Sequence, residues 1–180
     1  MSGRYGPVNQ TQAQYGYHFM VIVGDPGTRR ENNPPADERE AMDECSERAV
    51  ETVPSFTDNE LPDEIKQTSY IKAMESPDVV RSFGRWSECM STAGYSYKSP
   101  MDAMRDPRWN WKSRTANQAE VAAALRDVEC KKKFDVVNSW FQGEAVIQRA
   151  EIDRNKKELG EILSQIDTRD KAARKILDAD

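Results

Sequence analysis

The feature that most constrains the fold is a stretch of about 50 residues, from Asn117 to about Ile166, in which apolar residues recur every three or four positions. This spacing places them on one face of an α-helix. Asn117 is a predicted N-cap, with Glu120 three residues later. At 1.5 Å per residue, an unbroken helix would be roughly 75 Å long, which exceeds the width of a small domain. The face consists of Cys130, Phe134, Val137, Phe141, Ala145, Ile152, Leu159, Ile162 and Ile166.

This face is not uniform along the stretch. The apolar residues before Cys130 lie nearly half a turn round the helix from the later ones, so the helix either meets a different neighbour there or bends. A second apolar face between Val136 and Ile147 predicts that this part is covered on two sides. After Ile152 the stripe narrows to a coiled-coil-like spacing that Asn155 and Arg169 interrupt. We expect this end to contribute little to the core and to serve, if anything, as an oligomer or partner helix.

Shorter helical patterns precede it. From Asp37, a predicted N-cap, the apolar face of a helix contains Met42, Cys45, Ala49 and Val53, and Pro54 ends the helix. A weaker helix follows Pro62. Two further starts share one signal, in which a serine N-cap precedes a proline in the first turn. They are Ser76-Pro77, whose helix Gly94 is expected to end, and Ser99-Pro100.

The N-terminal residues show no helical pattern of this kind. Residues 1–36 are rich in Gly, Pro, Asn and Gln, which predicts an irregular strap with at most a short helix near Gln10. The longest apolar patch is residues 19–24, and no alternating pattern longer than this one predicts a strand. We therefore expect an all-α fold: a small helical bundle with an irregular strap (1–36), a helical domain (37–166) ending in the long helix, and a helical extension or frayed tail (167–180).

Charge and hydropathy exclude several classes of protein. With 32% charged residues and a mean hydropathy of −0.85, the 180-residue chain can bury only a narrow core. The net charge of −5 argues against nucleic-acid binding, which requires clustered basic residues. The one short basic run, Lys131–Lys133, is flanked by acidic residues, and we interpret it as a solvated helix face. No apolar run is long enough for a membrane span or an export signal.

Catalytic chemistry finds little support in the sequence. His18 is the single histidine, so a multi-histidine metal site is excluded, and we interpret it as a packed or solvated loop residue. No nucleophile elbow, phosphate loop or calcium loop is present. Carboxylates are abundant, but no pair of them is singled out. We expect no enzyme, no cofactor and no metal.

The three cysteines, Cys45, Cys89 and Cys130, form no Cys-x-x-Cys motif. Adjacent helices could bring Cys89 and Cys130 together, and closing that loop of about 40 residues would stabilise the fold by roughly 4 kcal/mol. The alternative is three buried, reduced thiols in a cytoplasmic protein. Cys45 shares its helix face with Met42 and Ala49, so we expect it to point inward.

Two tryptophans are candidates for a binding surface. Trp109 and Trp111 lie between predicted helices beside polar residues, where exposed indoles could stack on a sugar or anchor a protein partner. The alternative, which we favour, is a loop that covers one end of the core with both rings.

Two longer segments carry a family resemblance: "RWSECMSTAGYSYKSPMDAM" and "AEVAAALRDVECKKKFDVVNSWFQGEA". With Cys45-Ser-Glu47-Arg-Ala49 before them, they resemble a family of uncharacterised, actinobacterial-type extracytoplasmic helical proteins, often made with a signal peptide or lipoprotein anchor. The matching residues are Trp86, Cys89, Met90, Gly94, Tyr95, Tyr97, Asp127, Val128, Cys130, Lys131, Trp140 and Glu144. The resemblance implies an oxidising compartment and a Cys89–Cys130 disulfide, which leaves Cys45 as a buried free thiol. It implies no known activity, and this chain departs from the family in having no export signal.

These patterns favour a non-enzymatic protein of the cell envelope, or a secreted one, that binds an unidentified partner or ligand. The alternative is a hydrolase-like enzyme or an enzyme inhibitor with a carboxylate-lined cleft. Converging carboxylates in a concave pocket would favour the alternative, whereas exposed Trp109 and Trp111 would favour binding. The oligomeric state and the ligand stay open.

Overall fold

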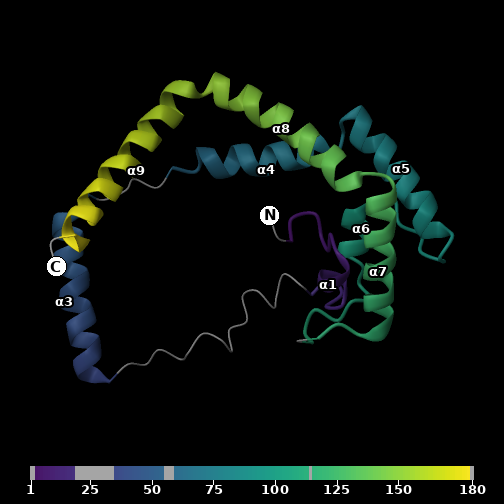
Figure 1. Ribbon diagram of the computed structural model, residues 1–180, viewed down its shortest axis with the longest axis horizontal. Helices are drawn as coiled ribbons and strands as arrows, with labels where there is room; N and C mark the ends of the chain where they lie inside the picture. The colour runs from purple at the N-terminus through teal and green to yellow at the C-terminus, as the bar shows by residue number, and fades with distance from the viewer. Residues whose placement is uncertain (1–2, 19–34, 55–58, 114, 179–180) are drawn as a thin grey trace. The chain divides into compact units, whose positions relative to one another are not determined.

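The computed structural model describes residues 3–18, 35–54, 59–113 and 115–178 (Figure 1). Over these residues the chain forms eight helices and no strand, which confirms the all-α prediction. The apolar patch at 19–24 lies outside the described residues. The chain divides into two compact units, Met1–Arg29 with Ser69–Ile147 (unit 1) and Arg30–Thr68 with Gln148–Asp180 (unit 2). This grouping differs from the predicted segments 1–36, 37–166 and 167–180.

Unit 1 contains the hydrophobic core. α5 (Pro77–Ser91) and the short α1 (Gln10–Ala13) both pack against α7 (Gln118–Lys133). The end of α4 (Leu61–Ala73), α6 (Pro100–Met104) and the first turns of α8 (Val136–Arg154) complete the unit. Among its fully buried side chains are Trp86 and Met90 of α5, Val128 of α7 and Trp140 of α8. Aromatic side chains therefore make up a large part of this core.

The helix starts and stops in this unit follow the predicted signals. Ser99 and Asp102 form a reciprocal capping box at α6. The Asn117 side chain accepts a hydrogen bond from the Glu120 amide at the start of α7. Gly94, just past the end of α5, has a φ of +85°, a conformation that residues with a Cβ rarely adopt. Local sequence therefore sets these ends.

The predicted single helix from Asn117 to Ile166 is wrong. The chain instead forms α7, α8 and α9 (Lys156–Leu177), with breaks at residues 134–135 and 155. At the first break Asp135 has a φ of +51°, and its carbonyl then accepts the Ser139 amide as α8 begins. The helix thus ends close to the point where the apolar face shifts, which agrees with a bend, one of the two explanations for that shift.

Unit 2 buries very few side chains. It contains α3 (Ala36–Thr52), the start of α4, the end of α8 and α9. Of its described residues, only Ile65 and Ile162 are buried. α3 has no buried residue, so the predicted inward face with Met42, Cys45 and Ala49 is wrong. Asp37 is not the N-cap of α3 either, because the N-cap is Pro35, two residues earlier, and Asp37 lies in the first turn of the helix.

Candidate functional site

The disulfide joins two helices of unit 1. Cys89 on α5 and Cys130 on α7 are bonded, with their Cα atoms 5.8 Å apart and a sequence separation of 41. This confirms the pairing that the resemblance implies. Cys45 is a free thiol, but its predicted burial is wrong: it is exposed because α3 packs no face against a neighbour.

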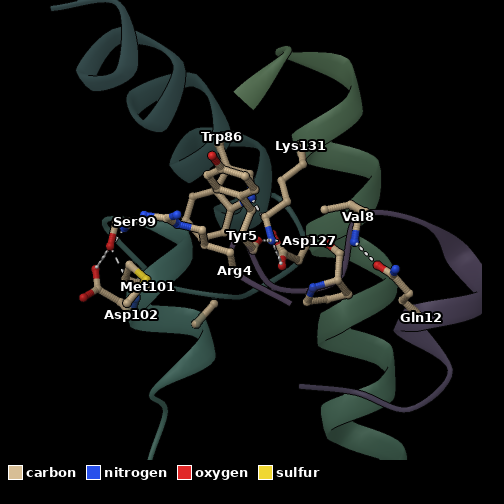
Figure 2. Close-up of polar contacts among 12 residues, drawn as sticks. Arg4, Tyr5, Val8, Gln12, Trp86, Ser99, Met101, Asp102, Asp127 and Lys131 are labelled. Atoms are coloured by element: carbon tan, nitrogen blue, oxygen red, sulfur yellow. Dashed lines mark hydrogen bonds and ion pairs between the residues drawn. The ribbon is translucent and has the colours of Figure 1, made fainter. Parts of the chain in front are cut away.

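A buried ion pair is formed by residues on either side of Cys130 in α7. The Lys131 ammonium is 2.7 Å from an Asp127 carboxylate oxygen, and the two side chains are 2% and 0% exposed. Trp86 donates its indole N–H to the other Asp127 oxygen at 2.8 Å. Figure 2 shows these three side chains converging between α5 and α7. The prediction of a solvated face is therefore wrong for Lys131, whereas Lys132 and Lys133 are exposed.

Burial dominates the electrostatics of this pair. It raises the pKa of the Asp127 carboxyl, and the Lys131 ammonium and the Trp86 indole act in the opposite direction. A buried carboxylate needs such partners because an uncompensated charge in the interior is strongly destabilising. The pair thus commits Lys131 to a fixed position at the end of α7.

Lys131 also fixes the N-terminal strap, of which residues 3–18 are described. Its ammonium donates to the carbonyl oxygens of Tyr5 at 2.7 Å and Pro7 at 3.3 Å. The Tyr5 hydroxyl donates to a Glu144 oxygen on α8 at 2.7 Å, and Arg4 forms an ion pair with the other Glu144 oxygen at 2.7 Å. The strap is therefore held by α7 and α8 through polar contacts that are largely buried.

The fixed strap forms one wall of a groove against α8. This groove, which we call the strap groove, has a volume of about 510 Å³. Its apolar residues are Tyr5 and Val8 from the strap and Val137 and Phe141 from α8, and its polar residues are Lys131, Lys132, Asp135 and Asn138. Val8, Val137 and Phe141 are partly buried, so their side chains stay accessible from the groove. An apolar floor with a polar rim suits an apolar side chain.

A second groove, between α5 and α8, has a volume of about 650 Å³ and is more polar. Its carboxylates are Asp78 and Asp135, of which Asp78 pairs with Arg81 and Asp135 accepts a hydrogen bond from Asn138 at 2.8 Å. Both carboxylates thus already have a partner. Asp135 and Asn138 line both grooves, so the start of α8 separates them.

The two candidate tryptophans have different environments. Trp109 is 3% exposed, donates its indole N–H to the Ala103 carbonyl at 2.6 Å and stacks on Tyr17. It belongs to the core and offers no surface to a partner. Trp111 is 45% exposed and stacks on the His18 ring, with the ring centres 4.9 Å apart. Partner binding therefore stays a prediction for Trp111 only.

His18 is a packed residue, one of the two interpretations that its sequence position allowed. The ring is 1% exposed, and its Nδ1 and Nε2 lie 2.7 Å from a Glu120 oxygen and 3.1 Å from the Asn110 carbonyl. The same Glu120 oxygen accepts the Tyr17 amide. Gly16, with a φ of +61°, allows this approach, because a Cβ there would lie 2.5 Å from that oxygen. Glu120 thus ties the strap to the start of α7.

Sequence reasoning named Glu120 beside an N-cap and included Asp127, Lys131 and Glu144 in the resemblance, but it did not predict that these charged side chains are buried. The i,i+4 spacing of Asp127 and Lys131, among the small apolar residues of α7, was a usable signal. Within the described ranges, no cluster of three or more potential metal ligands is found, and no helix is long and apolar enough to cross a membrane.

Comparison of the chain with protein-family models, with curated proteins and with solved structures gives no match.

Proposed function

We propose that this protein is a non-enzymatic binding protein of the extracytoplasmic space, and that its strap groove receives an apolar side chain of a protein partner in the cell envelope. The observation that carries the proposal is the groove itself: about 510 Å³, with an apolar floor, a polar rim and a wall built from the N-terminal strap. Concave apolar sites with a few convergent polar groups are the usual form of a recognition site.

The groove is formed before any partner arrives. The buried Lys131 ammonium fixes the backbone at Tyr5 and Pro7, and this places Val8 opposite Phe141 of α8. A preorganised wall lowers the conformational entropy that binding must remove. In protein–protein interfaces, the residues that contribute most to binding are often apolar or aromatic side chains that enter such a pocket. Polar contacts surround the pocket.

The rim restricts the chemistry of the partner. Lys132 is exposed and makes no ion pair with any residue of the described chain, whereas Asp135 is engaged by Asn138. Lys132 could therefore form an ion pair with an acidic or anionic group next to the inserted apolar side chain. The partner segment that fits best is an apolar residue flanked by a carboxylate.

The disulfide and the resemblance support the proposed compartment. The Cys89–Cys130 bond is compatible with an oxidising environment outside the cytoplasm. A lipoprotein anchor and an actinobacterial origin rest on the family resemblance alone. No feature of the described residues favours the alternative of an enzyme or inhibitor with a carboxylate-lined cleft, so that function is not proposed.

The test uses 8-anilinonaphthalene-1-sulfonate, a fluorescent apolar anion, as the probe for the groove. We expect one saturable site in the wild type, loss of most of the signal in Phe141→Asp, and no change in Val80→Asp, an exposed apolar position on α5. If the probe gave the same fluorescence titration with both variants, the strap groove would not be its binding site. Circular dichroism of each variant establishes that the helices are intact.

The biological partner is tested by photocrosslinking in envelope fractions. A photoreactive residue at 141 should give a crosslinked band that one at 80 does not, and Lys132→Glu should reduce its yield. Crosslinking of equal yield from both positions, insensitive to Lys132→Glu, would show that the groove is not the contact.

A further inference from the structure

Among the described residues, α3 is a helix that buries none of its side chains. It has 17 residues and none of them is buried. Its apolar residues are nevertheless spaced as one face, and Met42 and Val50 are 60% and 73% exposed. Isolated helices of this length are marginal in water, because helix nucleation is costly and tertiary packing supplies most of the stability.

α9 also has exposed apolar side chains. Only Ile162 of its 22 residues is buried. The exposed large apolar residues of this helix are Leu163 at 58%, Ile166 at 46%, Ile176 at 39% and Leu177 at 75%. Contiguous apolar side chains on an otherwise charged helix mark an interaction face.

The charges of the two helices indicate which face covers which. α3 contains seven acidic and two basic residues and has a net charge of −5, whereas α9 contains six basic and four acidic residues and has a net charge of +2. Two copies of α3 would repel each other. An α3 helix against an α9 helix brings opposite charges together around two apolar faces.

Unit 2 contains both helices, yet within one chain α3 buries no side chain on α9. We propose that unit 2 is a self-association module, in which α3 of one copy packs against α9 of a second copy. The contact is made twice across a two-fold axis, since α9 of the first copy receives α3 of the second. Cys45, which lies on the same face of α3 as Met42, becomes covered in this interface.

The first experiment measures molar mass by sedimentation as a function of protein concentration. We expect the wild type to reach twice the mass of the chain and Leu163→Asp/Ile166→Asp to stay at a single copy, with a dissociation constant raised by more than about tenfold. Val80→Asp is the control, because it also replaces an exposed apolar residue by a carboxylate, but in unit 1. A wild type that is monomeric at every concentration, or a dimer that both variants preserve, would overturn the proposal.

The second experiment tests the pairing of helices. Glu38→Lys/Asp43→Lys, at positions beside the apolar face of α3, should weaken the dimer, and adding Arg169→Glu/Arg174→Glu beside the apolar face of α9 should restore it, because the complementarity is re-established with the signs exchanged. Failure of the second pair of changes to restore the dimer would show that α3 does not face α9.

The thiol supplies an independent readout. The rate at which Cys45 reacts with a disulfide reagent should fall with the same concentration dependence as the molar mass. A wild-type monomer with a protected Cys45 would mean that α3 packs within its own chain, which contradicts the proposal. Phe141→Asp should leave the mass unchanged, so that failure of the groove and failure of the dimer are distinguishable.

Discussion

Asp106 shows how a single carboxylate is stabilised at the surface of the core. Its side chain is 7% exposed, accepts the Tyr97 hydroxyl at 2.5 Å and pairs with the Arg108 guanidinium at 2.6 Å. The hydrogen bonds from Arg108 are the largest cause that lowers the pKa of Asp106, to about 2. The folded protein therefore holds the carboxylate charged at pH values where the unfolded chain begins to protonate it.

Asp106→Asn should lower the free energy of unfolding by about 1–2 kcal/mol at pH 7. Because the pKa is depressed in the folded state, this stabilisation is complete above about pH 5 and is lost as the pH falls from about 4 towards 2. Urea unfolding of both proteins between pH 7 and pH 3 measures the difference, which should shrink at the acidic end. Asp78→Asn, which alters an exposed pair, is the control, and a difference independent of pH would contradict the assignment.

Lys131 shows what residue-level sequence reasoning can miss. The run Lys131–Lys133 has the composition of a solvated face, but the helix turns its first member towards Asp127 and the strap. Composition cannot separate these three residues, because burial of one depends on a carboxylate and two carbonyls brought together by the tertiary fold. The resemblance did include Lys131 among its matching positions, without a reason for it.

Lys131→Met should therefore lower the free energy of unfolding by about 3–5 kcal/mol, because Asp127 would remain buried without its counter-ion. Lys132→Met, the next residue in the run, should change it by less than about 0.5 kcal/mol. Chemical unfolding followed by tryptophan fluorescence measures both. Similar effects of the two substitutions would show that Lys131 is as solvated as its neighbour.

Cys45 and the disulfide pair should differ in reactivity. In dilute native protein the exposed Cys45 should consume one equivalent of thiol reagent within minutes, while Cys89 and Cys130 stay unlabelled until the protein is reduced and unfolded. Mass mapping of a non-reduced digest identifies the labelled peptide. Any linkage that contains Cys45 within one chain would show that the pairing is different.

At the scale of elements, the ends of helices are easier to predict from the sequence than breaks within a helical pattern or the neighbours of a helix face. Ser99 and Asn117 start helices and Gly94 follows the end of one. Each acts within a few residues of its own position, so the sequence alone predicts these roles. The break at Asp135 has neither glycine nor proline to announce it, and only the shift of the apolar face indicates it. Periodicity on α3 shows which side chains share a face, but not whether that face has a neighbour.

The disulfide links the two helices that form the centre of unit 1. Because it closes a loop of 41 residues, its removal in Cys89→Ser/Cys130→Ser should lower the free energy of unfolding by about 4 kcal/mol on the chain-entropy model. Thermal unfolding monitored by circular dichroism compares the variant with the wild type. A double variant of unchanged stability would mean that the bond is dispensable to the fold, and Cys45→Ser is the control without effect on the monomer.

At the scale of the whole molecule, the strap groove could not be predicted. It needs Val8 and Phe141, which are far apart in sequence and meet only because Lys131 and Glu144 hold the strap in place. Helical periodicity did identify Phe141 and Val137 as apolar positions, but not that they remain accessible. The sequence therefore supplies the residues of the site and the tertiary fold supplies their arrangement.

The two units should differ in local stability, since unit 1 contains nearly all of the described buried side chains. In the Leu163→Asp/Ile166→Asp variant, amide hydrogens of α5 and α7 should exchange slowest and those of α3 fastest. Hydrogen exchange followed by mass spectrometry resolves the helices. Protection of α3 equal to that of α7 would show that α3 has a packing surface that the structure of one chain does not reveal.

The contacts of the strap have a consequence for the timing of folding. Lys131 is 126 residues from the Tyr5 carbonyl that it binds, and Glu144 is 139 residues from the Tyr5 hydroxyl. At a synthesis rate of about 5–20 residues per second, Lys131 is made roughly 6–25 s after the Tyr5 carbonyl that it binds. Contacts of such long range also slow the final search after synthesis. The segment of unit 1 that is made first thus completes its contacts only after α7 and α8 are made, and until then the apolar residues that it covers on these helices remain open to chaperones.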